Sequence, residues 1–166
     1  MIFENAINLL LKHEGRFTDN ELDNGNWTGG KKGVGILKGT NFGISAAAYP
    51  DLDIRSLTQK EAATIYKRDY WDKCRCDELP DHIRYSVFDF AVNGGVSRAI
   101  KTLQSCASVK KDGIIGANTL EASKSVSKER YALERMFFYC QLVRRNQSQA
   151  KFLGGWSLRT MDVYNA

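Results

Sequence analysis

The sequence predicts a mainly α-helical protein with one small glycine-rich β or loop region near residues 16–44. Apolar residues recur three and four positions apart over much of the 166-residue chain, which is the spacing of one helix face. Thr58-Gln59-Lys60-Glu61 matches a capping box at the start of a helix. Seven of the 14 glycines fall within residues 16–44, where little helical period is present.

The first helix is expected over residues 2–13, where apolar residues share helical spacing and Glu4 lies in the first turn. Gly15 is placed to end this helix, so Glu14 stands at its C-terminal end. The glycine-rich stretch that follows is expected to form a short twisted hairpin or an irregular loop. It carries the carboxylates Asp19, Glu21 and Asp23.

Helical signals dominate from the capping box onward. Leu57 and Ala62 are placed as a hydrophobic staple for a helix that continues to Tyr70. The next helix follows Pro80 and is stopped by Asn93-Gly94-Gly95. A further helix is expected after Ser97, which is placed as its cap, and Asp112-Gly113 marks a turn.

A long helix is expected from about Ser127. Its apolar residues on one face predict the side that packs on the core: Leu133, Met136, Phe137, Cys140 and Val143. Cys140 is therefore expected to be buried. Gly154-Gly155 is expected to break the helical pattern before a short tail.

Charge divides the chain unevenly. The net charge is +5, and residues 101–166 carry 11 basic against 5 acidic groups. This basic half indicates either an anionic partner or a solvated face. Nucleic acid is not expected, because no zinc-finger, basic-zipper or RNA-binding signature is present.

Neither a metal site nor a membrane segment is predicted. Cys74-Arg75-Cys76 lacks the spacing of zinc and redox motifs, and His13 and His82 have no partner pattern. No apolar run approaches the roughly 18 residues of a membrane span, and the chain starts without a basic signal region. The thiols are expected to be reduced where the protein is made.

Glu14 is the first candidate for chemistry. A carboxyl at the end of a helix faces the negative end of the helix dipole, and partial burial acts in the same direction. Both effects favour the protonated form, which a general acid needs near neutral pH. A second carboxylate in the wetter loop would stay ionised, and two carboxyls in such different environments are the acid–base pattern of glycoside hydrolysis.

Residues 13–44 and 57–120 resemble glycoside hydrolase family 108, the phage and bacterial N-acetylmuramidases. The matching pieces lie in the family's order: His13-Glu14-Gly15, Gly39-Thr40-Asn41-Phe42-Gly43-Ile44, Leu57-Thr58 with Glu61-Ala62-Ala63, Tyr66 with Asp69-Tyr70-Trp71, Phe88 to Gly95, and Asp112 to Gly116 with Thr119. Gly154-Gly155-Trp156 with Arg159 is similar to the end of the family's C-terminal part.

The resemblance implies a lysozyme-like fold and a catalytic set of Glu14, Asp23 and Thr40. Glu14 would be the catalytic acid, while Asp23 would orient water or stabilise the transition state and Thr40 would hold the water or the sugar. Residues 24–38 are inserted relative to the family's short motif, so Asp19 competes with Asp23, and Thr28 is a weaker rival of Thr40.

Four further residues are predicted to bind substrate: Asn41, Tyr70, Trp71 and Asn93. Tyr70 and Trp71 would form a platform for a sugar ring, with core packing as the alternative. Asn93 would bond an acetamido group or simply cap its helix. Trp156 is expected to anchor the packing of the C-terminal part.

The resemblance thus implies a catalytic part over residues 1–93 and a helical peptidoglycan-binding part over residues 94–166, packed as one compact unit. The expected function is a phage endolysin that cleaves the β-1,4 bond between N-acetylmuramic acid and N-acetylglucosamine, without a cofactor. A lytic transglycosylase and a non-catalytic peptidoglycan-binding protein are the alternatives.

The expected partner is peptidoglycan, with anionic cell-wall or outer-membrane polymers as further candidates. The protein is expected to be a monomer without stable membrane insertion. Since no signal is recognised, it would be made in the host cytoplasm and reach the cell wall through a holin-type lesion. A bacterial autolysin and a secreted antibacterial effector are the alternatives.

Overall fold

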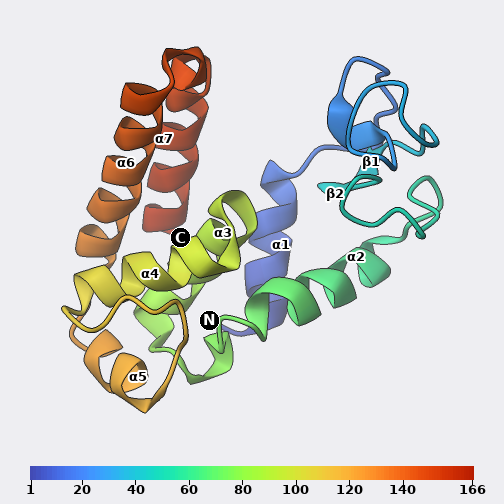
Figure 1. Cartoon of the computed structure of the whole chain (residues 1–166). Coiled ribbons are helices and arrows are strands. Elements are labelled where there is room, and N and C mark those ends of the chain that lie inside the picture. Colours follow the sequence, from blue (N-terminus) through green and yellow to red (C-terminus); the bar gives the residue numbers. More distant parts are fainter. The chain divides into compact units, whose positions relative to one another are not determined.

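The computed structural model describes all 166 residues and divides into two compact units. We call Glu4–Tyr66 the N-terminal unit, and Met1–Phe3 with Lys67–Ala166 the helical unit. Seven α-helices and a single two-stranded sheet make up the regular structure (Figure 1), so the predicted mainly α fold is confirmed. The predicted division into a catalytic part, residues 1–93, and a peptidoglycan-binding part, residues 94–166, stays a prediction.

The N-terminal unit holds two helices that begin as the sequence predicts. Helix α1 (Phe3–His13) buries Ala6, Ile7 and Leu10. Helix α2 (Gln59–Tyr66) follows the predicted capping box, in which the Thr58 backbone N–H donates to Glu61 Oε2 at 2.8 Å. The Glu61 N–H donates in return to Thr58 Oγ1 at 3.3 Å.

Between these helices the chain has little regular structure. A short 3₁₀ turn, η1 (Asn24–Asn26), precedes strands β1 (Thr40–Asn41) and β2 (Ile44–Ser45). The strands pair antiparallel with Thr40 opposite Ser45, so of the two predicted alternatives a short hairpin is present, within a stretch that is otherwise irregular. Phe42 and Gly43 form its turn with φ of 50° and 75°, the left-handed values of the tight turns that suit hairpins.

The helical unit contains the other helices. They are the π-helical turn η2 (Lys67–Trp71), the 3₁₀ turn η3 (Cys76–Glu78), α3 (Asp81–Gly94), α4 (Val96–Cys106), α5 (Ala117–Ser123), α6 (Lys128–Arg145), the 3₁₀ turn η4 (Gln147–Gln149) and α7 (Ala150–Asn165). Ser127 caps α6 by accepting from the Arg130 N–H at 3.2 Å. The expected Ser97 cap is wrong, because α4 begins at Val96 and Gly95 is its cap residue.

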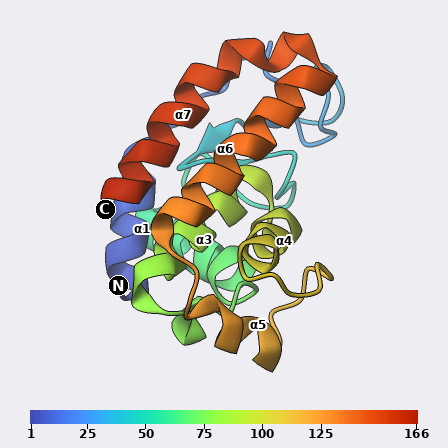
Figure 2. The same cartoon turned by 90° about the vertical axis from the view of Figure 1, so that its left-hand side faces the viewer.

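The predicted break at Gly154-Gly155 is also wrong. Helix α7 runs through both glycines and lies beside α6 in a helical hairpin (Figures 1 and 2). Trp156 stacks on Tyr139 of α6 with the ring centroids 4.7 Å apart. This packing, which fits the expected anchoring role of Trp156, outweighs the roughly 1 kcal/mol that a glycine costs in a helix interior.

The predicted core face of α6 needs correction. Leu133 and Phe137 are 67% and 58% exposed, and Cys140 is exposed rather than buried. The buried residues of this helix are Tyr131, Arg135 and Tyr139. The apolar pattern misled because a charged residue, Arg135, occupies the centre of the buried face.

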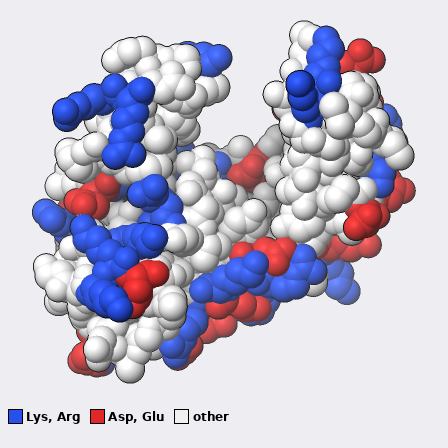
Figure 3. Space-filling view, in the orientation of Figure 1, with Lys and Arg blue, Asp and Glu red and all other residues white.

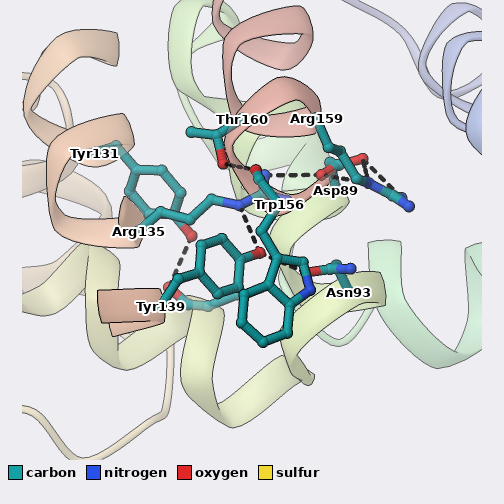
Figure 4. A network of polar contacts seen from close by, with 9 residues as sticks. Asp89, Asn93, Tyr131, Arg135, Tyr139, Trp156, Arg159 and Thr160 are labelled. Carbon is teal, nitrogen blue, oxygen red and sulfur yellow. Dashed lines mark hydrogen bonds and ion pairs between the residues drawn. The ribbon is translucent and has the colours of Figure 1, made fainter. Parts of the chain in front are cut away.

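Arg135 is buried because a buried carboxylate pairs with it (Figure 4). Asp89 of α3 is fully buried, and its oxygens lie 2.8 Å from Arg135 Nη1 and 2.9 Å from Arg159 Nη2 of α7. The Arg135 contact is an ion pair without hydrogen-bond geometry, so Nη1 and Nη2 of Arg135 have no hydrogen-bond partner. Arg135 Nε donates to the Tyr139 hydroxyl at 3.0 Å, and that hydroxyl donates to Asn93 Oδ1. One buried network therefore joins three helices.

None of the helices combines the length and apolar character that a bilayer crossing requires. All four cysteines are free thiols, and Cys74 and Cys76 are buried. Burial raises the pKa of the Cys76 thiol well above its usual value, so this group is held in its neutral form.

Candidate active site

Glu14 directly follows the last residue of α1 and is half-buried. Its carboxylate lies over the α-carbon of Gly43: a methyl group built at Gly43 would come closer than 3.0 Å to Glu14 Oε2. The hairpin turn therefore approaches the carboxylate at a distance that only glycine permits. The end of α1 and the turn of the β1–β2 hairpin meet at this point.

The Tyr66 hydroxyl is the third group at this point. The same methyl group at Gly43 would come closer than 3.0 Å to the Tyr66 oxygen as well. Tyr66 is the last residue of α2, is 2% exposed, and donates its hydroxyl proton to the Phe42 carbonyl oxygen at 2.8 Å. The turn that faces Glu14 is thus tied to α2 by a buried hydrogen bond.

Thr40 lies in β1 and is held from two sides. Its Oγ1 donates to Asn26 Oδ1 at 2.7 Å, and its backbone pairs with Thr18 through bonds of 2.8 and 2.9 Å. Asn26 is fully buried and also donates to the Asn20 carbonyl at 3.0 Å. Since the hydroxyl proton of Thr40 is directed to Asn26, the Thr40 oxygen can only accept from a further group.

Each candidate for the second carboxylate already has a partner. Asp23 is exposed and caps the η1 turn, with Oδ1 accepting from the Gly25 N–H at 2.9 Å. Asp19 forms an exposed ion pair with Arg55 at 2.7 Å, and the Arg55 guanidinium lies 4.4 Å from the centre of the Phe17 ring. Both carboxylates are exposed, so each remains open to solvent beside the partner that it already has.

Two other loop residues serve the backbone. Asn41 is 7% exposed, and its amide nitrogen donates to the Ile54 and Leu57 carbonyls at 3.2 and 3.3 Å. The Thr28 hydroxyl oxygen accepts from the Ile36 N–H at 2.8 Å. Both side chains thus hold loops in place, and the substrate contact of Asn41 stays a prediction.

The remaining predicted substrate ligands belong to the helical unit. Trp71 is fully buried, with its ring edge-on to Phe3 and Phe88 at 5.3 Å from each, which is the core position weighed against a sugar platform. Tyr70 is half-buried in the same π-helical turn. Asn93 is exposed and accepts from the Tyr139 hydroxyl through Oδ1. The roles of Tyr70 and Asn93 toward substrate stay predictions.

Sequence reasoning did not select Gly43, Tyr66 or Asn26 as site residues. Gly43 and Tyr66 lie within matching pieces of the family, so a signal for them was present. Asn26 had none, because nothing in its neighbourhood distinguishes it from an ordinary turn asparagine. No three His, Cys, Asp or Glu side chains of the chain gather as metal ligands.

Comparison with known proteins identifies the family of this chain. The family model described as Glycosyl hydrolase 108 matches residues 7–95, and the one described as Predicted Peptidoglycan domain matches residues 98–161. No curated protein sequence matches.

Among the solved structures, SagA from Brucella abortus is 29% identical, with a TM-score of 0.76 over 98% of this chain and 91% of that chain. The chain therefore belongs to the glycoside hydrolase 108 family, as a mainly helical, lysozyme-like peptidoglycan hydrolase with a peptidoglycan-binding part.

Proposed function

We propose that this chain is an N-acetylmuramidase of the endolysin type, which hydrolyses the β-1,4 bond between N-acetylmuramic acid and N-acetylglucosamine. The observation that carries the proposal is the position of Glu14. Its half-buried carboxylate directly follows the last residue of α1 and lies against Gly43. The hairpin turn that contains Gly43 is held by the hydrogen bond from the Tyr66 hydroxyl. A carboxyl held in one orientation can deliver a proton to one oxygen of a bound glycan.

In this mechanism Glu14 protonates the glycosidic oxygen as the bond to the sugar breaks. A loop carboxylate, Asp23 or Asp19, stabilises the positive charge that develops on the sugar ring or activates a water molecule. Thr40 is suited to hold that water, because its oxygen accepts a water proton while its own proton remains on Asn26.

Asp23 and Asp19 are the two candidates for the second carboxylate, and each already makes one contact in the structure. Asp23 holds the η1 turn through one oxygen, and Asp19 holds Arg55 through one oxygen. Each is also connected to Thr40, Asp23 through the turn that contains Asn26 and Asp19 through the neighbouring Thr18. These contacts are alike, so we favour Asp23 because the resemblance to the family implies it, and we retain Asp19 as its alternative.

The deciding experiment compares Glu14→Gln, Asp23→Asn and Asp19→Asn on purified peptidoglycan, with circular dichroism to establish that each variant folds. Loss of a general acid lowers the rate by roughly 10²–10⁴-fold, so Glu14→Gln should release almost no reducing ends. A folded Glu14→Gln protein of unchanged activity would refute the proposal. A greater loss in Asp19→Asn than in Asp23→Asn would reassign the second carboxylate.

Product analysis addresses the chemical outcome. Hydrolysis gives muramic acid ends that carry a free reducing group, whereas an internal attack by the sugar gives anhydro ends. Mass spectrometry of the released fragments should therefore detect reducing ends. Anhydro ends would identify a lytic transglycosylase, and the absence of either product from peptidoglycan that binds the protein would identify a non-catalytic binder.

We further propose a phage origin and release from the host cytoplasm through a holin-type lesion. Expression of the chain in the cytoplasm of a Gram-negative bacterium should leave cells intact until the inner membrane is permeabilised, and chloroform should then cause lysis. Lysis on expression alone would contradict this route.

A further inference from the structure

A basic pocket lies between α4 and α6 of the helical unit, within the stretch that matches the peptidoglycan domain. Its volume is about 280 Å³. Helix α4 contributes Arg98 and Lys101, the following loop contributes Lys111, and Arg145 lies in the last turn of α6. Figure 3 shows basic side chains gathered on the part of this face that α4 and α6 form.

The four cations of the pocket make no ion pair with any acidic group of the chain. The single carboxylate that lines the pocket is Glu134, which is about a quarter exposed. Its oxygens are held by the Ser105 hydroxyl at 3.1 Å and, more loosely, by Arg130 at 3.9 Å. The pocket therefore presents four unneutralised cations around one fixed anion.

Aromatic rings form the apolar part of the same pocket. Phe137 is 58% exposed, although it is a large apolar residue on a helix, and Phe138 lies beside it. The Arg98 guanidinium is 4.6 Å from the centre of the Phe138 ring. This contact orients one cation of the pocket at an apolar wall.

We propose that this pocket binds the stem peptide of peptidoglycan. The stem peptide combines several carboxylates with short aliphatic side chains, and its diamino acid carries an ammonium group beside a carboxylate. The cations suit the carboxylates, the phenylalanine rings suit the aliphatic carbons, and Glu134 suits the ammonium group. A phosphate polymer would also be attracted by the four cations, but it carries no ammonium group for Glu134 and no aliphatic side chain for the rings.

This inference rests on the proposed function, because it assigns the peptide part of the same substrate to a second site. It separates two tasks within the chain: the N-terminal unit would act on the glycan, and the pocket would select strands that carry peptide. Contacts between the pocket and the stem peptides of the substrate should then raise the affinity of the chain for intact peptidoglycan without changing the rate of the chemical step.

The test uses the full chain with two double variants of equal charge change. Lys111→Glu with Arg145→Glu reverses two cations of the pocket. Lys110→Glu with Arg144→Glu reverses their sequence neighbours, which do not line the pocket and lie in the same loop and the same helix turn. Any effect of net charge or of the helix dipole is therefore matched between the two proteins.

Binding to sacculi is measured by co-sedimentation in a Glu14→Gln background, so that no substrate is consumed. The pocket variant should bind roughly tenfold more weakly at physiological salt, and its matched control should stay within about twofold of the parent. Equal binding by the two double variants would overturn the proposal.

A soluble probe identifies the ligand. The purified stem tripeptide that ends in diaminopimelate should shift amide resonances of α4 and α6 and should compete with sacculi. Competition by poly(glycerol phosphate) without competition by the tripeptide would replace the peptide with a phosphate polymer and overturn the proposal.

Peptide-free glycan strands separate this inference from the proposed function. With Glu14 restored, the pocket variant should hydrolyse these strands at the rate of the parent. If the parent itself releases no reducing ends but still binds the tripeptide, the proposed function fails and the pocket assignment stands. If the pocket variant hydrolyses both peptide-free strands and intact peptidoglycan more slowly than the parent, the pocket residues support catalysis or folding, and the peptide assignment fails.

Discussion

Different interactions stabilise the loop that faces Glu14 and the core of the helical unit. Residues 15–57 contain only two-residue strands and a 3₁₀ turn, and polar side chains such as Asn26 and Asn41 hold their backbone. In the helical unit, aromatic rings and the buried pairing of Asp89 with two arginines join whole helices. The loop thus depends on many individually small hydrogen bonds, and the helical core on a few large contacts.

This difference predicts how single substitutions in the loop and in the helical core should affect stability and activity. A hydrogen bond contributes roughly 0.5–1.5 kcal/mol, so a single change in the loop should alter local order and activity more than global stability. Removal of one partner from a buried ion pair costs about 3–5 kcal/mol, so a single change in the helical core should alter global stability.

The largest effect is expected from Asp89→Ala. It leaves Arg135, which is 1% exposed, and the largely buried Arg159 without their counter-charge. We expect a loss of about 3–5 kcal/mol in the free energy of unfolding, measured by urea denaturation. Asp162→Ala, at an exposed position of α7, is the matched control and should change stability by less than about 0.5 kcal/mol. Similar losses in both variants would contradict a special role for the buried network.

Gly43→Ala is the next test, since it should separate activity from stability. The added methyl group collides with the Glu14 carboxylate and the Tyr66 hydroxyl, and since Tyr66 is buried and hydrogen-bonded to the turn, the half-buried carboxylate is the group that must move. We expect a fall in hydrolysis rate of about 10²-fold, as misplacement of a catalytic group by about 1 Å causes.

Gly33→Ala is the control for this variant. Gly33 has a φ of 77°, close to the 75° of Gly43, and no atom lies within 4 Å of an added methyl group. It therefore carries the same backbone strain without the collision, and should retain most of its activity. Equal losses of activity in both variants would show that backbone strain at a left-handed glycine causes the loss, and not the close approach of residue 43 to Glu14.

Asn26→Ala tests the polar support of the loop. The change removes the acceptor of the Thr40 hydroxyl and the donor to the Asn20 carbonyl, at a cost of about 1–3 kcal/mol. Hydrogen exchange should accelerate in residues 18–41 and stay unchanged in α6 and α7. Faster exchange in those two helices as well would mean that the loop and the helical core do not respond separately.

The smallest effect concerns the capping box of α2. Hydrogen bonds from the Thr58 backbone and hydroxyl lower the pKa of Glu61 below its usual value of 4.5. Because the folded pKa lies below the unfolded one, this contribution to stability is present above pH 4.5 and is lost as the pH falls through the folded pKa. Glu61→Gln should therefore lower Tm slightly at neutral pH, and this difference in Tm should shrink as the pH falls below 4.5. A difference that does not change with pH would contradict the ionic part of this cap.

Local sequence patterns predicted the helical class, the start of α1, the capping box at Thr58, the start of α6 near Ser127 and a short hairpin or loop in the glycine-rich stretch, because these features depend on neighbours within a few residues. They also marked Glu14, since a carboxyl between a helix end and a glycine-rich loop is a local feature. Only the tertiary structure decided which face of α6 is buried and that α7 continues through two glycines. The reason is physical: Arg135 is stable in the core only because Asp89, 46 positions earlier, reaches it across the fold. In the same way, Gly43 and Tyr66 act on Glu14 through contacts that the spacing of residues along the chain does not encode.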